Sequence, residues 1–482
     1  MKQSSLLFLA VIISLSSFAQ QTRYYTDPQE KFKDAKEFFQ KEQYSLAYPL
    51  LKELQRDRRE TDKISEPVIS QEINYYATVC ALKQNESIAE NLAKDYIELE
   101  KNNARKQMMS FHLAEYYFRQ QRFADAVHLY EEANIANLSN AEIAEMKFHQ
   151  GYSYFTLQNF ALAKPLFNTI RQMKDDPNYI DANYYYGFIA FKDRNYSDAL
   201  QSFKVVENEA NYKTIVPYYI AQIYYIQGKK EEAITYAEQK LKSGAAQYYD
   251  LELKQLLGHA YFEKKEYAKA LPLLEDYVNH SDKVRREDLY ELSYTYYQAD
   301  QYEKAIEGFK QLSGKEDSLS QHAMYLLGDS YLKTGQKTNA RNAFLFGSSN
   351  NSNPTQREIS RFNYAKLSYE LGYQDEALNV LRTFLNEYPN STYNNEAREL
   401  MVAVLANTNN YRDALILLEG LQTPSVNAKR LYPRILYGRA TELVNDGRMQ
   451  EANALLDRAL KDPNNGAVLP YINFWKGEIA YR

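Results

Sequence analysis

The sequence has little cysteine and few residues that interrupt helices. Its 482 residues contain one cysteine, Cys80, with 16 glycines and 13 prolines. A single thiol cannot form an intramolecular disulfide, so packing has to stabilise the fold. We expect Cys80 to be a buried helix residue and not a reactive thiol. The scarcity of glycine and proline beside 45 tyrosines favours helices over turn-rich β structure.

An excess of basic residues is also missing. The 58 lysines and arginines stand against 63 aspartates and glutamates, which gives a formal net charge of -5. This balance argues against nucleic acid and anionic membranes as partners. After the N-terminus, no run approaches the roughly 18 apolar residues that a membrane-spanning helix needs. We therefore expect no nucleic-acid partner and no transmembrane span.

The N-terminus has the organisation of a secretory signal peptide. Lys2 precedes an apolar run over residues 6–15, and Ser17 and Ala19 place small side chains at the two positions that define cleavage before Gln20. The prediction is a signal peptide at residues 1–19, a short extension at residues 20–27, and export to the periplasm. No cysteine lies near the cleavage site, so we predict a soluble protein without a lipid anchor.

Small residues recur with a period of 34 to 42 residues. The period is marked by twelve alanines: Ala47, Ala89, Ala126, Ala163, Ala199, Ala233, Ala270, Ala305, Ala340, Ala377, Ala414 and Ala452. The residue twelve positions before each alanine is small in eleven of the twelve cases, Val402 being the exception. A period of this length with apolar residues at helical spacing predicts an array of helix pairs.

The pattern also predicts how the two helices of a pair meet. A small residue permits close approach, and the apolar or aromatic residue that follows most of the alanines by four positions fills the space beside it. Four glycines lie five positions before their alanine: Gly228, Gly335, Gly372 and Gly447. We expect them in the turn between the helices, where glycine adopts a positive φ at little cost.

Two segments carry the fullest version of the pattern. In GHAYFEKKEYAKA (258–270) and SYTYYQADQYEKA (293–305), a small residue is followed by aromatics three and nine positions later and by alanine at twelve. The chain thereby resembles tetratricopeptide-repeat proteins over residues 28–482, most weakly in the second, eleventh and twelfth units. The resemblance implies an all-α solenoid, an α-α superhelix, of about twelve helix pairs. Gly477 would begin a truncated thirteenth unit, so we expect the array to continue beyond residue 482.

The sequence contains no recognisable signature of catalysis or of cofactor binding. The glycine spacing near Gly308 does not form a phosphate-binding loop, and there is no nucleophile elbow. The six histidines include no metalloprotease pair, and His112 and His128 fall on different expected helices. We therefore predict a protein that is not an enzyme and that has no catalytic residue, no cofactor and no metal site.

The family resemblance implies that a binding site would lie on the first helix of each pair. In tetratricopeptide repeats this helix lines the concave side, and the residues three before and four after the small position face it. Both positions are aromatic without interruption in the third to sixth units, and also in the first, eighth and tenth. The candidate partner-binding residues are Phe111, Phe118, Phe148, Phe155, Tyr184, Phe191, Tyr218, Tyr225, Tyr290 and Tyr297.

Two interpretations of these aromatics stay open. They could only brace adjacent repeats, or they could form an apolar surface for an extended peptide or a partner helix. The leading hypothesis is a non-catalytic protein-interaction scaffold that serves envelope assembly or secretion in a Gram-negative-like bacterium, in association with outer-membrane or other envelope complexes. The alternatives are an adaptor for a catalytic or other domain beyond residue 482, and a glycan- or peptidoglycan-binding module.

Overall fold

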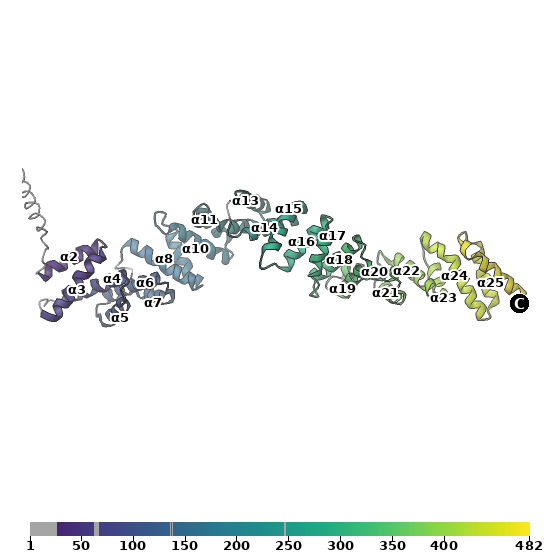
Figure 1. Cartoon of the computed structure of the whole chain (residues 1–482), viewed down its shortest axis with the longest axis horizontal. Helices are drawn as coiled ribbons and strands as arrows, with labels where there is room; N and C mark the ends of the chain where they lie inside the picture. Colours follow the sequence, from purple (N-terminus) through teal and green to yellow (C-terminus); the bar gives the residue numbers. More distant parts are fainter. Residues whose placement is uncertain (1–26, 62–66, 135, 137, 245–246) are drawn as a thin grey trace, which may run out of the picture. The chain divides into compact units, whose positions relative to one another are not determined.

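The computed structural model describes residues 27–61, 67–134, 136, 138–244 and 247–482. Throughout these ranges the regular structure is helical, and no β-strand occurs (Figure 1). The predicted signal peptide lies outside the described residues, as does the predicted extension up to residue 26. The chain divides into two compact units, residues 1–223 and 224–482. The expectation of an all-α solenoid of consecutive helix pairs is confirmed.

In the first unit, first and second helices alternate along the chain. The first helices are α2 (Pro28–Gln40), α4 (Pro67–Lys83), α6 (Asn103–Arg119), α8 (Asn140–Thr156) and α10 (Tyr179–Lys192). The second helices are α3 (Tyr44–Thr61), α5 (Ala89–Leu99), α7 (Phe123–Glu132), α9 (Phe160–Ile170) and α11 (Tyr196–Val206). The next first helix, α12 (Val216–Ile226), contains the boundary between the two units.

The second unit continues the alternation. Its second helices are α13 (Lys230–Lys242), α15 (Tyr267–His280), α17 (Tyr302–Lys310), α19 (Lys337–Ser349), α21 (Gln374–Glu387), α23 (Tyr411–Glu419) and α25 (Met449–Lys461). Its first helices are α14 (Asp250–Glu263), α16 (Arg286–Gln298), α18 (Ser318–Lys333), α20 (Pro354–Glu370), α22 (Asn394–Asn407), α24 (Val426–Asn445) and α26 (Leu469–Tyr481). A short 3₁₀-helix, η2 (Asn465–Ala467), precedes α26. Within the described residues, no helix is both long and apolar enough to cross a membrane.

Where the small residue of the first helix is glycine, it makes room for a large residue of the second helix. A Cβ atom built on Gly328 would lie 2.7 Å from Cζ of Phe344, and one on Gly258 would lie 2.9 Å from Cγ of Leu274. A Cβ on Gly187 would lie 3.1 Å from the Phe203 ring. The expectation that small and large residues interlock is confirmed in these pairs.

Every turn within a helix pair contains one residue with a positive φ. The four glycines predicted for this position have φ between 75° and 86°. In the other turns the same conformation, with φ between 55° and 62°, is adopted by Glu42, Asn85, Gln121, Gln158, Arg194, Lys265, Asp300 and Asn409. The turn geometry is therefore common to all twelve pairs, although only four of them use glycine.

The cysteine is buried as expected. Cys80 lies in α4 and has no exposed surface. Burial raises the pKa of its thiol to about 12. The thiolate, which is the reactive form, is therefore almost absent at neutral pH.

Candidate partner-binding surface

The predicted aromatic residues are all at least half-buried. Phe111 and Phe148 are only 3% and 7% exposed. The remaining eight keep part of their surface accessible: Phe118, Phe155, Tyr184, Phe191, Tyr218, Tyr225, Tyr290 and Tyr297. The columns chosen from the sequence therefore combine interior rings with rings at the surface.

Rings from consecutive first helices of the first unit contact one another in a continuous series. The contacts, as centroid distances, are Phe118–Tyr152 at 5.8 Å, Tyr152–Tyr185 at 5.3 Å, Tyr185–Phe155 at 4.8 Å, Phe155–Phe188 at 5.5 Å, Phe188–Tyr219 at 6.0 Å and Tyr219–Phe191 at 5.2 Å. We call these seven residues the aromatic series. It connects α6, α8, α10 and the beginning of α12.

The aromatic series contains predicted residues and residues that sequence reasoning missed. Phe118, Phe155 and Phe191 were candidates. Tyr152, Tyr185, Phe188 and Tyr219 were not. Tyr152 and Phe188 each directly follow the small glycine of their helix. The sequence signal for Tyr152 and Phe188 is the recurrence of an aromatic directly after the small residue in consecutive repeats.

Tyr184 has a different environment from the aromatic series. Its ring stacks on Tyr212 at 4.2 Å between centroids with an interplanar angle of 21°. Tyr212 belongs to the segment between α11 and α12, and its hydroxyl donates a hydrogen bond of 2.5 Å to Asp181. Tyr184 is thus part of the packing between α10 and the following connection.

In the second unit the predicted tyrosines connect neighbouring first helices through their hydroxyl groups. Tyr225 donates to Glu263, and Tyr297 donates to Asp329 over 2.6 Å. The hydroxyl of Tyr290 lies 2.7 Å from Nδ1 of His322. Burial, followed by the hydrogen bond to Asp329, raises the pKa of Tyr297. The phenols of Tyr225 and Tyr297 stay protonated at neutral pH and donate to these carboxylates.

Two carboxylate–imidazole pairs occupy equivalent places between first helices, with the residue types exchanged. In the first unit Glu115 of α6 faces His149 of α8, with 2.9 Å between Oε2 and Nδ1. In the second unit His259 of α14 faces Glu291 of α16, with 2.6 Å between Nδ1 and Oε1. The hydrogen bond to Glu291 raises the pKa of His259.

The two histidines considered as zinc ligands from the sequence have separate environments. Nε2 of His112 lies 3.0 Å from the hydroxyl of Tyr75, and burial lowers the pKa of His112 to about 3. The imidazole of His112 is therefore neutral at physiological pH. His128 is exposed on α7.

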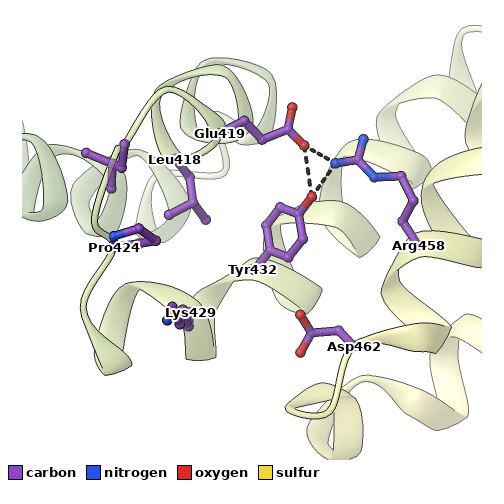
Figure 2. A pocket seen from close by; sticks show the side chains of 8 residues that line it. Leu418, Glu419, Pro424, Lys429, Tyr432, Arg458 and Asp462 are labelled. Carbon is purple, nitrogen blue, oxygen red and sulfur yellow. Dashed lines mark hydrogen bonds and ion pairs between the residues drawn. The ribbon is translucent and has the colours of Figure 1, made fainter.

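A pocket of about 340 Å³ lies among α23, α24 and α25. Leu418, Leu421 and Pro424 provide its apolar wall. Figure 2 shows Glu419, Tyr432 and Arg458 pointing toward one another and joined by mutual hydrogen bonds. Lys429 and Asp462 complete the lining, so two acidic and two basic side chains balance. The pocket has no net charge that would favour an ionic ligand.

Comparison with known proteins agrees with the helix pairs. Models of the tetratricopeptide repeat match residues 290–345 and 360–391. Among solved structures, the C-terminal part of a TPR repeat-containing protein from Cytophaga hutchinsonii is 19% identical, with 51% of this chain and 97% of that chain covered and a TM-score of 0.39. The P58(IPK) TPR domain is 16% identical, with 70% of this chain and 99% of that chain covered and a TM-score of 0.22. No curated protein matches the sequence.

The matched segments lie on consecutive helix pairs. Residues 290–345 run from α16 to α19, and residues 360–391 cover most of the α20–α21 pair. These pairs share the positive-φ turn with the rest of the array, and Gly328 and Phe344 interlock in the same way as the small and large residues elsewhere. The chain therefore contains tetratricopeptide repeats at residues 290–345 and 360–391, and its other helix pairs share their turn geometry.

Proposed function

We propose that the protein is a non-catalytic scaffold that binds a protein or peptide partner on the face formed by its first helices. Tetratricopeptide repeats are protein-interaction modules, and this is the general role expected of the chain. The partly exposed rings among the predicted aromatic residues and in the aromatic series together provide the binding surface. Glycan binding and an adaptor role for another domain are the competing functions.

The observation that carries the proposal is the partial exposure of the aromatic series. Six of its seven rings are half-buried in the protein alone, Tyr219 being the buried member. An aromatic side chain can bury about 150–250 Å². Covering a further 60 Å² of one such ring would contribute roughly 1.5 kcal/mol at about 25 cal/mol per Å². Adjacent rings of this kind can act together as a binding hot spot.

We further propose that the scaffold is exported to the periplasm, where it supports envelope assembly or secretion. The support is the apolar run before Ala19 and the absence of cysteine near the cleavage site. N-terminal sequencing of the protein from its native host should begin at Gln20. A protein that retains Met1 would contradict export by this signal.

A site-specific crosslinking experiment tests the binding surface. p-Benzoylphenylalanine replaces Phe188 of α10, which conserves an aromatic ring. The matched control places the same residue at Leu162, which is 46% exposed on second helix α9. Irradiation in the native host should yield a protein adduct at position 188 and none at position 162. Equal adducts at both positions would contradict a specific surface on the first helices.

A second measurement separates binding from bracing. Once the adduct partner is identified and purified, Phe188→Ala should weaken its binding by about 30-fold, which corresponds to about 2 kcal/mol. Hydrogen exchange in α10 and α12 should change little. If exchange in these helices rises while the affinity is unchanged, the ring only braces the repeats. Displacement of the partner by peptidoglycan fragments would instead favour the glycan-binding alternative.

A further inference from the structure

Three possible metal ligands converge between α6 and α8. Glu145 and His149 are four residues apart on α8 and therefore lie on the same face of that helix. Glu115 reaches them from α6. One ligand atom from each residue lies within 4.8 Å of the other two, which makes them the one such group of three among the described residues. This spacing allows a single ion to contact all three.

The two carboxylates of the group would be stabilised by a cation between them. Glu115 is only 4% exposed, and the carboxylate of Glu145 is within 4.8 Å of it. Two carboxylates this close repel each other, most strongly where one of them is shielded from water. A positive charge between them would remove the repulsion. It can come from a proton on His149 or from a metal ion.

The surroundings hold two of the ligands in a fixed orientation. The hydroxyl of Tyr130 donates a 2.7 Å hydrogen bond to Oε1 of Glu115. The ring of Phe118 stacks on the imidazole of His149, with 3.9 Å between centroids and 17° between planes. A hydrogen-bond donor such as Tyr130 orients its ligand in the way that outer-shell partners do in protein metal sites. The stacked Phe118 ring limits rotation of the imidazole.

We propose that Glu115, Glu145 and His149 bind one divalent transition-metal ion, for which Zn²⁺ is the best match. Two carboxylate oxygens and one imidazole nitrogen are ligands that Zn²⁺ accepts. Three protein ligands leave a fourth position for water. The site shares Phe118 with the aromatic series, but it does not rest on the proposed partner, because metal binding is measured on the protein alone.

The chain contains a natural control for this site. His259 and Glu291 form the same type of pair between α14 and α16, at 2.6 Å. Within the described residues no third ligand joins them at comparable spacing. The pair should therefore be satisfied by a shared proton alone and should not bind the metal.

The test is titration of the full chain with ZnCl₂ by calorimetry at neutral pH. The expected result is one tight site per chain. Glu145→Gln should weaken it at least about ten-fold, as expected for loss of a ligand when loss of an outer-shell partner already costs that much. Glu145 is exposed, so this variant should fold normally. His149→Gln should have a similar effect, and His259→Gln should have none.

A spectroscopic measurement identifies the ligands directly. Co²⁺ in place of Zn²⁺ should give visible absorption bands of a four-coordinate site in the unmodified protein, and these bands should be lost in Glu145→Gln. The absence of a tight Zn²⁺ site, or a site that is unchanged in Glu145→Gln, would overturn the proposal. In that case Glu115 and His149 form only the hydrogen-bonded pair that the structure shows.

Discussion

The contact between Gly328 and Phe344 allows a quantitative prediction. In Gly328→Ala, the new Cβ would lie 2.7 to 2.9 Å from three atoms of the Phe344 ring. Real Cβ atoms do not approach this closely, so the ring or the helix has to move. Phe344 is only 1% exposed, so the ring has little space to move into. Overpacking of this kind costs about 1–3 kcal/mol.

A helix-propensity gain partly offsets this cost. Alanine is more favourable than glycine inside a helix by about 1 kcal/mol. We therefore expect Gly328→Ala to destabilise the α18–α19 pair by up to about 2 kcal/mol. Gly477→Ala in α26 is the matched control, since no described atom lies within 4 Å of its Cβ. It should stabilise α26 by up to about 1 kcal/mol.

A double-mutant cycle identifies the contact responsible. Phe344→Leu conserves most of the apolar volume and should alone cost about 1 kcal/mol. Combined with Gly328→Ala, it should cost about 1 kcal/mol less than the sum of the two, because the smaller side chain relieves the clash. Repeat arrays are coupled mainly to nearest neighbours, so the measurement is hydrogen exchange in α18 and α19. Strict additivity, or a Gly328→Ala protein with undiminished protection, would refute the interlocking mechanism.

Three further predictions follow from the turns, the His259 pair and the cysteine. Arg194→Gly should raise the free energy of unfolding by about 1 kcal/mol, because a side chain at positive φ is strained. Gly335→Ala should lower the free energy of unfolding by a similar amount. Chemical denaturation of both variants checks this. The pKa of His259 is raised in the folded protein, so its pair with Glu291 stabilises fully below the unfolded pKa of about 6.5, and this stabilisation is lost as pH rises through the folded pKa. Thermal unfolding across this range should show the loss, and His259→Gln should remove it; a pH dependence that persists in that variant belongs to other groups. Cys80 should resist a thiol reagent in the native protein and react only after unfolding; rapid native labelling would contradict its burial.

The helix pairs were predictable because their cause is local and repeated. The small residue, the alanine and the large residue recur in the sequence and meet within a single pair, as Gly258 and Leu274 do. The turns were predictable only where glycine occurs. At Arg194 and Lys265 the same positive φ is imposed by the packing of the two helices. Neither residue type has a preference that would reveal it.

The binding surface was only partly predictable because its contacts cross between repeats. The family pattern pointed to Phe118 and Phe155, but Tyr152 becomes part of the aromatic series only when consecutive first helices are placed side by side. Buried polar contacts were still harder to predict from the sequence. Gln321 is fully buried, and its amide donates to the carbonyl groups of Gly347, Asn350 and Asn353. No periodic pattern predicts a hydrogen bond across 26 to 32 residues.

The opposite polarity of the two carboxylate–imidazole pairs bears on how faithfully the array assembles. A chain of similar units can pair a helix with the wrong neighbour while it folds. If α6 stacked on α16, Glu115 would meet Glu291, and two carboxylates would repel each other. If α14 stacked on α8, His259 would meet His149, and neither imidazole would have its counter-ion. Each pair thus favours packing of a first helix against its own neighbour. It disfavours packing against the equivalent helix elsewhere in the chain.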